Sequence, residues 1–397
     1  MKRLQKLSSL LLILCVLCSA VLLSGSDSGE AKAASPLVGC AILHEPEFGG
    51  VYITATIEAF NAMGYEYGDS VDIQFSNGYS LTDQPYYNGY YTQNGESLLI
   101  AYPGYDYIKA CINNGDDLWE IAGLTESDTA SVSLHERGKY LDIQNARDIH
   151  YYDEREKYES DEVFANFRSV SVTGLAPDTL YRAASPCDNQ HDRATYVDAL
   201  IQAAGVRCIL NLADNEEKIA RYLADESYAT PYFQSLYEAG NVIPLALNMN
   251  FGSAAFQQKL ANGLIALSEH EGPYLVHCTE GKDRTGFVCI LLEALCGADY
   301  EEIVADYMIT YKNYYGITQA TDPERYTVIV EKVFDPMVQV IAGDGADIRT
   351  ADLKAGAETF LQNVGMTQAQ ISALEARLSV KATPHNTPAA SSGKIAP

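Results

Sequence analysis

A short apolar run, a polar loop and a helical pattern follow one another without interruption between Pro273 and Gly297. The apolar run at 274–276 predicts a buried strand, because turn signals bound it on both sides. Apolar side chains then recur at helical spacing from Phe287 to Leu295, and Gly297 provides a stop signal. A strand that passes through a tight loop into a helix is a βα unit, so we expect a sheet of the α/β class.

The loop itself places five residues between Cys278 and Arg284. Five residues let the backbone curl so that its N–H groups point inward, and such a nest at a helix N-terminus binds anions. Gly281 and Gly286 allow the close backbone approach that this curl requires. The planar guanidinium of Arg284 can hold two phosphoryl oxygens at once. The predicted phosphate-binding residues are Thr279, Glu280, Gly281, Lys282, Asp283 and Arg284.

Cys278 is the candidate nucleophile, because the nest and the helix N-terminus that it faces favour a thiolate. The hydroxyl of Thr285 can donate a hydrogen bond to the sulfur. His277 is expected to support the loop as a hydrogen-bond donor that helps to keep Cys278 ionised. The sequence thus predicts nucleophilic attack on phosphorus, with protein side chains and backbone supplying all the charge stabilisation.

The loop HCTEGKDRTG resembles the active-site signature of cysteine-dependent phosphatases, H-C-x5-R-[ST]. In its HCxxGKDRTG form it is similar to bacterial secreted protein-tyrosine phosphatase-like proteins that have dual-specific or lipid-specific relatives. The resemblance implies hydrolysis of phosphomonoesters, foremost protein phosphotyrosine, through a phosphocysteine intermediate. Two alternatives stay open, namely a phosphatase for phosphoinositides or inositol polyphosphates, and a phosphoryl-binding module that does not turn over.

Two aspartates are the main candidates for the general acid that protonates the leaving group. The resemblance implies Asp283 for loops with the GKDR sequence, whereas Asp214 follows a strand as an aspartate on a mobile loop would. Asp306 is a third candidate. The positive charge of Lys282 should attract a second anionic group of the substrate, and the negative charge of Glu280 should oppose that attraction.

The resemblance extends over residues 166–378. Segments around Arg168, Arg182 and Asp306 are similar to the same family. One departure is the strand that ends in Asn211, since relatives often carry Asp-Leu-Arg where this chain has Asn-Leu-Ala. Strands alternate with helices in this region, so we expect a cysteine-phosphatase-like domain with a mostly parallel central sheet flanked by helices.

Residues 36–150 follow a different pattern, and predict a small β-rich domain. Short strand patterns stand between Gly, Asn and Asp turn signals at 71–75, 97–102 and 130–134. Tyrosines cluster at 85–91 and again at 102–107. These clusters fit an aromatic surface that recognises a glycan or a polypeptide, or alternatively tyrosines that pack on a sheet face. The charged residues 151–165 predict a linker.

The first 33 residues have the pattern of a secretory signal peptide. A basic start at Lys2, Arg3 and Lys6 precedes the apolar run Leu10–Leu23, and a small-x-small pattern ends at Ala33. The alternative is an uncleaved membrane anchor, for which the run is short. We therefore expect a protein that acts outside the cytoplasm and is not inserted in the membrane after cleavage.

Composition limits the partners. A net charge of −26 argues against nucleic acid and anionic membrane as default partners. The expected partner is a phosphorylated protein or phospholipid substrate, and the oligomeric state stays open. Nine cysteines without metal-ligand spacing predict neither a disulfide framework nor a zinc site, and no metal or cofactor is expected. Residues 379–397, rich in Ala, Pro, Ser and Thr, predict a disordered tail.

Overall fold

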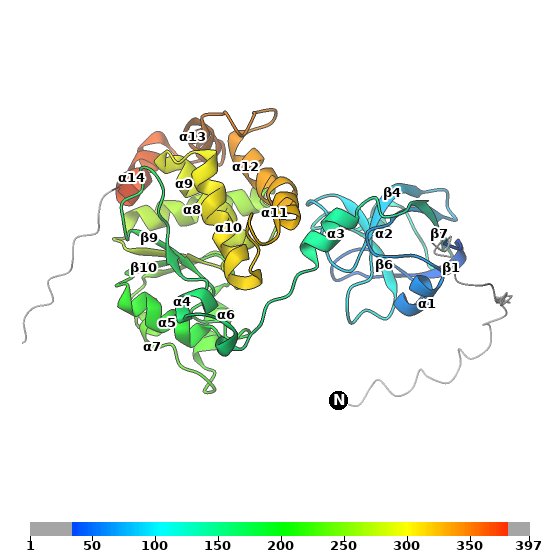
Figure 1. Ribbon diagram of the computed structural model, residues 1–397, viewed down its shortest axis with the longest axis horizontal. Helices are drawn as coiled ribbons and strands as arrows, with labels where there is room; N and C mark the ends of the chain where they lie inside the picture. Colours follow the sequence, from blue (N-terminus) through cyan, green and yellow to red (C-terminus); the bar gives the residue numbers. More distant parts are fainter. Residues whose placement is uncertain (1–33, 380–397) are drawn as a thin grey trace, which may run out of the picture.

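The computed structural model describes residues 34–379, which form a β-barrel followed by an α/β part (Figure 1). The barrel is closed, in the strand order β1-β2-β6-β5-β4-β3-β7. Its pairs are antiparallel except β4–β5, which is parallel. The strands are β1 (Leu37–His44), β2 (Val51–Ile53), β3 (Ser70–Phe75), β4 (Ser80–Tyr87), β5 (Ser97–Ile100), β6 (Ile108–Ile112) and β7 (Thr129–Glu136).

Along the barrel strands, side chains alternate between the buried interior and the outer surface. On β3, Val71, Ile73 and Phe75 are buried while Gln74 between them is exposed, as the period of a strand requires. Phe60 packs into the same core. It lies on α1 (Ile57–Ala62), which follows β2 directly in the sequence. The other barrel helix is α2 (Leu118–Ile121).

The prediction of a mostly parallel central sheet is wrong. The second sheet is mixed, with strand order β11-β10-β12-β9-β8. β8 pairs antiparallel with β9, and the three other pairs are parallel. The connection from β8 to β9, residues 170–179, is too short for the crossover that a parallel pair needs. The strands are β8 (Arg168–Ser169), β9 (Leu180–Ala183), β10 (Cys208–Asn211), β11 (Val242–Pro244) and β12 (Tyr274–His277).

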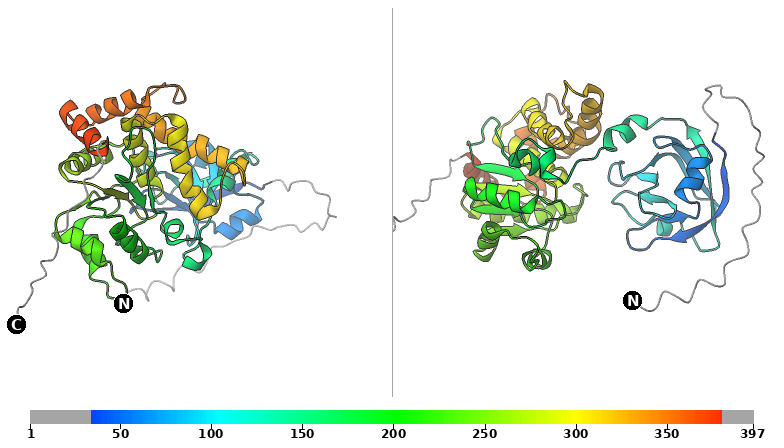
Figure 2. Two further views of the ribbon diagram at one scale, coloured as in Figure 1. Left: turned by 60° about the vertical axis from the view of Figure 1, so that its left-hand side comes forward. Right: turned by 60° about the horizontal axis from the view of Figure 1, so that its bottom comes forward.

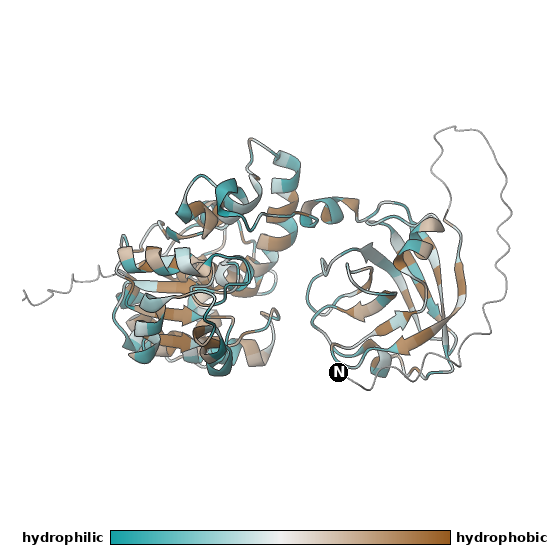
Figure 3. Cartoon of the chain, turned by 90° about the horizontal axis from the view of Figure 1, so that it is seen from below, coloured by the Kyte–Doolittle hydropathy of each residue, from teal (hydrophilic) through white to brown (hydrophobic). Residues whose placement is uncertain are grey.

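Helices cover both faces of this sheet (Figures 1 and 2). Alternate residues of β12 divide between two cores, because Val276 packs with α8 and α9 while Leu275 packs with α5 and α7. Figure 3 shows the strands as predominantly hydrophobic. The helices are α4 (Asp161–Phe164), α5 (Ala194–Ala203), α6 (Glu216–Leu223), α7 (Pro231–Glu238), α8 (Ala254–Glu269), α9 (Asp283–Cys296), α10 (Tyr300–Tyr315), α11 (Pro323–Ile329), α12 (Asp335–Ala342), α13 (Leu353–Asn363) and α14 (Gln368–Ser379), with a π-helical turn η2 (Val330–Phe334).

Direct hydrogen bonds join the barrel to the α/β part. Asn94 donates to the carbonyl of Met249 at 2.6 Å, and Gln93 donates to the carbonyl of Lys332 at 2.8 Å. The helix α3 (Leu141–Arg147) then leads out of the barrel, and Arg325 donates to the carbonyl of Asn145 at 3.0 Å. The two parts therefore meet along a defined boundary.

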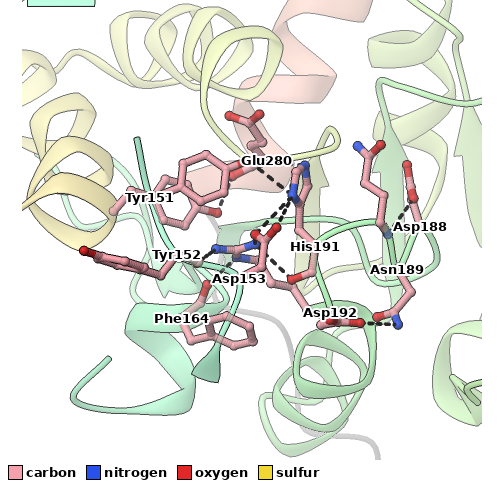
Figure 4. A network of polar contacts seen from close by, with 12 residues as sticks. Tyr151, Tyr152, Asp153, Phe164, Asp188, Asn189, His191, Asp192 and Glu280 are labelled. Carbon is pink, nitrogen blue, oxygen red and sulfur yellow. Dashed lines mark hydrogen bonds and ion pairs between the residues drawn. The ribbon is translucent and has the colours of Figure 1, made fainter. Parts of the chain in front are cut away.

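The segment after α3 is attached to the α/β part, as Figure 4 shows. Arg193 donates to the carboxylate of Asp153 at 2.8 Å and to the carbonyl of Tyr152 at 2.8 Å. The ring of Tyr151 stacks on that of Tyr314 with centroids 5.0 Å apart. A short 3-10 turn η1 (Arg155–Lys157) follows. The predicted linker is thus packed against the α/β part by an arginine and aromatic rings.

The predicted signal peptide, residues 1–33, lies outside the described residues, as does the predicted disordered tail apart from Ser379. Between residues 34 and 379, no helix has both the length and the apolar character needed to cross a membrane.

Candidate active site

The loop that contains Cys278 connects β12 to α9 at the carboxyl end of the strand. Gly281 sits in its tightest bend with φ +68°, and a Cβ atom there would lie 2.2 Å from the carbonyl oxygen of Ala183. A Cβ atom on Gly286 would lie 2.7 Å from the ring of Tyr307. Both positions therefore require glycine, the first for its backbone conformation and both for space.

The carbonyl groups of the loop are turned outward and hydrogen-bonded. The Thr279 carbonyl accepts from the backbone N–H of Ser185 at 3.0 Å. The Glu280 carbonyl accepts from the hydroxyl of Tyr314 at 2.7 Å. The Gly281 carbonyl accepts from Arg182 and from Asn166, each at 3.2 Å.

The backbone N–H groups of the same loop are free. Within residues 34–379, the amides of Thr279 to Lys282 donate no hydrogen bond. Helix α9 also begins without a side-chain cap. Anchored carbonyls with free amides are the arrangement of an anion-binding nest at a helix N-terminus.

The side chains of the loop add further unpaired donors. Arg284 donates to the carbonyl of Leu247 at 3.1 Å and to the hydroxyl of Thr279 at 3.3 Å, whereas its buried Nε has no partner in the described part of the chain. The buried hydroxyl of Thr285 likewise has none. Cys278 is 3% exposed. The loop thus gathers a thiol, a guanidinium and several unpaired donors in one short segment.

His277 is completely buried beside Cys278. Its Nδ1 lies 3.1 Å from the carbonyl oxygen of Cys278, so it contacts the loop backbone. Burial lowers the pKa of His277 to about 4, which keeps the ring neutral at pH 7. A neutral ring brings no positive charge to the thiol, so the ring acts through its hydrogen bond to the loop.

Asp283, Lys282 and Glu280 form a charged edge of the loop. The ammonium of Lys282 lies 2.7 Å from the carboxylate of Asp283 and 4.0 Å from that of Glu280. Burial raises the pKa of Asp283, but the positive charges of Lys282, Arg147 and Arg284 outweigh burial and leave this pKa lowered. Asp283 is therefore ionised at neutral pH, and Lys282 is already paired.

Asp214 follows β10 and is only 2% exposed. Its carboxylate accepts from Asn211 at 3.2 Å, and its backbone N–H donates to the side-chain oxygen of Asn211 at 3.0 Å. β10 pairs with β12, where Asn211 lies opposite His277. The asparagine that departs from the family pattern therefore fixes Asp214 on the strand next to the loop.

Asp306 is locked below the loop. Its carboxylate lies 2.7 Å from Arg182 and 2.9 Å from Arg168. Burial alone would raise the pKa of Asp306, but these two guanidinium groups reverse the effect and lower it strongly. Both carboxylate oxygens are held by guanidinium groups and the side chain is 6% exposed, so Asp306 is not open to a leaving group and its role is structural.

Three residues that touch the loop or lie against it gave no signal in the sequence. Asn166 binds the carbonyl of Gly281, Tyr314 binds that of Glu280, and Arg147 lies close enough to Asp283 to affect its pKa. Only Asn166 stood next to a segment with family resemblance, at Arg168. All three are far from the loop in sequence, so spacing could not reveal them.

One group of possible metal ligands occurs among residues 34–379, and it lies in the barrel. It consists of His44, Asp117 and Glu120. His44 and Asp117 already bind each other at 2.6 Å, and Asp117 also accepts the backbone N–H of Gly50 at 2.8 Å. Asp117 is also the N-cap of α2, where it accepts the backbone N–H of Trp119 at 2.9 Å.

Comparison with known proteins places the loop within one family. A family model described as "Tyrosine phosphatase family" matches residues 140–380. The triple specificity protein phosphatase PtpB of Mycobacterium tuberculosis is 43% identical over 51 residues, which are 13% of this chain and 18% of that relative. The chain therefore matches less than a fifth of the length of this curated relative.

Two solved structures give weak matches. TpbA of P. aeruginosa is 18% identical, with 54% of this chain and 96% of TpbA covered, at a TM-score of 0.21. A conserved protein from Thermotoga maritima is also 18% identical, with 28% and 42% covered, at a TM-score of 0.21. Scores this low are no evidence of a shared fold. The family match by contrast spans more than half of the chain and includes the loop from Cys278 to Arg284, so the chain belongs to the tyrosine phosphatase family.

Proposed function

We propose that this protein hydrolyses phosphomonoesters, foremost phosphotyrosine in proteins, with Cys278 as nucleophile. The observation that carries the proposal is the loop of free backbone amides between Cys278 and Arg284, with its carbonyls anchored outward. Such a loop stabilises the charge on three phosphoryl oxygens without rearranging during the reaction. Arg284, with an unpaired Nε, supplies the positive charge that a phosphoryl group needs.

The reaction takes two displacements at phosphorus. In the first, the thiolate of Cys278 forms an S–P bond while the P–O bond to the leaving group breaks, and an acid gives a proton to the leaving oxygen. In the second, the oxygen of a water molecule attacks phosphorus, the S–P bond breaks, and the same carboxylate takes up a proton from that water. The hydroxyl of Thr285 is a donor that can steady the sulfur as it leaves.

We assign the acid to Asp283, with Asp214 as the alternative. The Asp283 side chain is 24% exposed and lines a cavity, so it is accessible to a substrate group. Asp214 is almost completely buried and held by Asn211. Because the pKa of Asp283 is lowered, its carboxylate is ionised at neutral pH and can accept a proton from water in the second displacement. Its role as acid in the first displacement requires the protonated form, which acidic pH favours.

Turnover of a phosphotyrosine peptide and of p-nitrophenyl phosphate, with EDTA present, tests the proposal. Wild type should release phosphate from both substrates. Cys278→Ser should lose turnover and still bind a phosphotyrosine peptide, since the amides and Arg284 remain. Arg284→Ala should lose binding as well as rate. Activity that disappears in EDTA and returns with a divalent ion would contradict the proposal, and so would substantial activity of Cys278→Ser.

The same assay separates the substrate classes. Phosphoserine peptides, phosphoinositide vesicles and inositol hexakisphosphate are compared with phosphotyrosine peptides at equal concentration. We expect the largest kcat/KM for phosphotyrosine. An inositol polyphosphate needs several free cations around the cleft, whereas Lys282 in this loop is already neutralised by Asp283.

A further inference from the structure

A cavity of about 630 Å³ lies between the barrel and the loop that contains Cys278. Its wall on the barrel side includes Tyr90, Tyr91 and Tyr102, and its other wall includes Glu280 and Lys282 of the loop. The volume is that of an ordinary ligand site. Two residues of the loop therefore share this cavity with the tyrosines of the barrel.

The tyrosine cluster of the barrel divides into two sets. Tyr86 is completely buried in the barrel core, whereas Tyr87, on the other face of β4, is 1% exposed and packs against Tyr91. The cavity is lined by Tyr90, Tyr91 and Tyr102, of which Tyr102 is 44% exposed. Tyr90 is fixed by a hydrogen bond of 3.0 Å to the hydroxyl of Tyr105. These rings form a pre-organised aromatic surface, which suits the recognition of a polypeptide.

Among the described residues that line this cavity, Arg147 is the cation that forms no ion pair. Lys282 is paired with Asp283, and His150 lies 3.4 Å from Asp148. The Arg147 guanidinium makes no hydrogen bond and no ion pair with any residue from 34 to 379, and it lies over the ring of Tyr91 at 5.6 Å.

Arg147 also lines a second cavity of about 420 Å³, which reaches Asp283. Its position between the two cavities places a forked, permanently charged donor beside the candidate acid.

We propose that the larger cavity binds the residues that flank the phosphorylated residue of a peptide substrate, and that Arg147 selects an acidic side chain among them. This inference rests on the phosphatase function proposed above. It assigns to the barrel a part in substrate recognition, with Tyr90, Tyr91 and Tyr102 as the surface against which the peptide packs.

The charges of the cavity favour a peptide over a polyphosphate or a lipid surface. Arg147, which forms no ion pair between residues 34 and 379, lines the cavity together with Glu280 and Asp148, so the cavity can neutralise one carboxylate and not a group of phosphates. Of the large apolar side chains exposed between residues 34 and 379, only Tyr102 lines this cavity. Insertion into a bilayer would need more apolar contact at this edge.

Matched phosphotyrosine peptides test the inference. A single Glu is placed in turn at each of the three positions before and after phosphotyrosine, and each peptide is compared with its Gln counterpart. In wild type, kcat/KM should favour Glu about tenfold at one or two adjacent positions, as a charge-assisted hydrogen bond predicts. Arg147→Gln should reduce that ratio to about one, and Arg147→Lys should retain part of it.

The ratio is internal to each variant, so a change in overall rate does not affect it. The matched control is Arg207→Gln, an arginine that pairs with Glu271 on the surface, and it should keep the full ratio. The inference fails if wild type turns over all peptides without a Glu preference, if Arg147→Gln keeps the preference, or if phosphoinositide vesicles are hydrolysed while peptides are not. Absence of turnover on p-nitrophenyl phosphate, on every peptide and on phosphoinositide vesicles would instead refute the phosphatase function itself.

Discussion

The carboxylate of Asp283 and the ammonium of Lys282, 2.7 Å apart, determine at residue scale how this loop responds to pH. Because the pKa of Asp283 is lowered, the carboxylate is charged at neutral pH and only a small fraction carries the proton that a leaving group needs. The rate of the first displacement should therefore rise as the pH falls below neutrality. Removing the cation should relax this dependence.

Lys282→Met should move the basic limb of the pH–rate profile for a phosphotyrosine peptide to higher pH. The physical reason is that loss of the ammonium raises the pKa of Asp283, so the acid keeps its proton to higher pH. The measurement is kcat over a pH series for wild type and variant. Lys312→Met, outside the loop, is the control and should leave the limb in place. If the basic limb of the Lys282→Met profile does not move, Asp283 is not the general acid.

The two candidate general acids can be distinguished by how the rates of Asp283→Asn and Asp214→Asn depend on the leaving group of the substrate. If Asp283 is the acid, its Asn variant should slow a tyrosyl phosphate by about 100-fold or more and p-nitrophenyl phosphate much less, because a good leaving group needs no proton. Asp214→Asn should show no such dependence. The reverse pattern would assign the acid to Asp214. An equal loss on every substrate would mean that the variant damages the loop.

At the scale of elements, the Asp306 ion pairs tie α10 to β8 and β9 under the loop. Arg182 also holds the carbonyl of Gly281, so the same side chain fixes the helix and the loop. Both members of the Arg182 pair are at most 6% exposed. Breaking a buried pair leaves uncompensated charges, which costs far more than breaking an exposed one.

Asp306→Ala should lower the free energy of unfolding by roughly 3–5 kcal/mol at pH 7. Because the folded pKa of Asp306 is lowered, its contribution is present above the unfolded pKa of about 3.9 and is lost as the pH falls through the folded value. The difference in the free energy of unfolding between wild type and variant, measured by urea unfolding, should become smaller as the pH is lowered below about 4. Glu271→Ala, which breaks an exposed pair, should cost at most about 1 kcal/mol. An equal cost in both variants would contradict this account.

The elements also show where local pattern is sufficient and where it is not. The strand before Cys278 and the helix after Arg284 were predictable, because both lie in one continuous segment with clear periodicity. The boundary between α13 and α14 is less evident from pattern, since the two helices are separated by a short turn that contains Gly365 at φ +101°. The mixed sheet was missed because β8 has only two residues, too few to show a strand period.

At the scale of the whole molecule, the sequence indicated two parts but not how they meet. The thiol, the loop and Arg284 follow from spacing alone. Arg147 and the barrel tyrosines reach the cavity through the docking of two folded parts, through contacts such as that of Asn94 with Met249. Such contacts join residues that are remote in sequence and carry no local signature. The signal peptide, the domain boundaries and secretion stay predictions.

Rapid acid quench of the reaction with a phosphotyrosine substrate, followed by mass spectrometry of the digested protein, tests the central claim most directly. The claim is that Cys278 carries the phosphoryl group between the two displacements. We expect a phosphoryl group on the peptide that contains Cys278 in wild type during turnover, and none in Cys278→Ser. Turnover with the phosphoryl group on another residue, or with no covalent adduct at any quench time, would contradict the account.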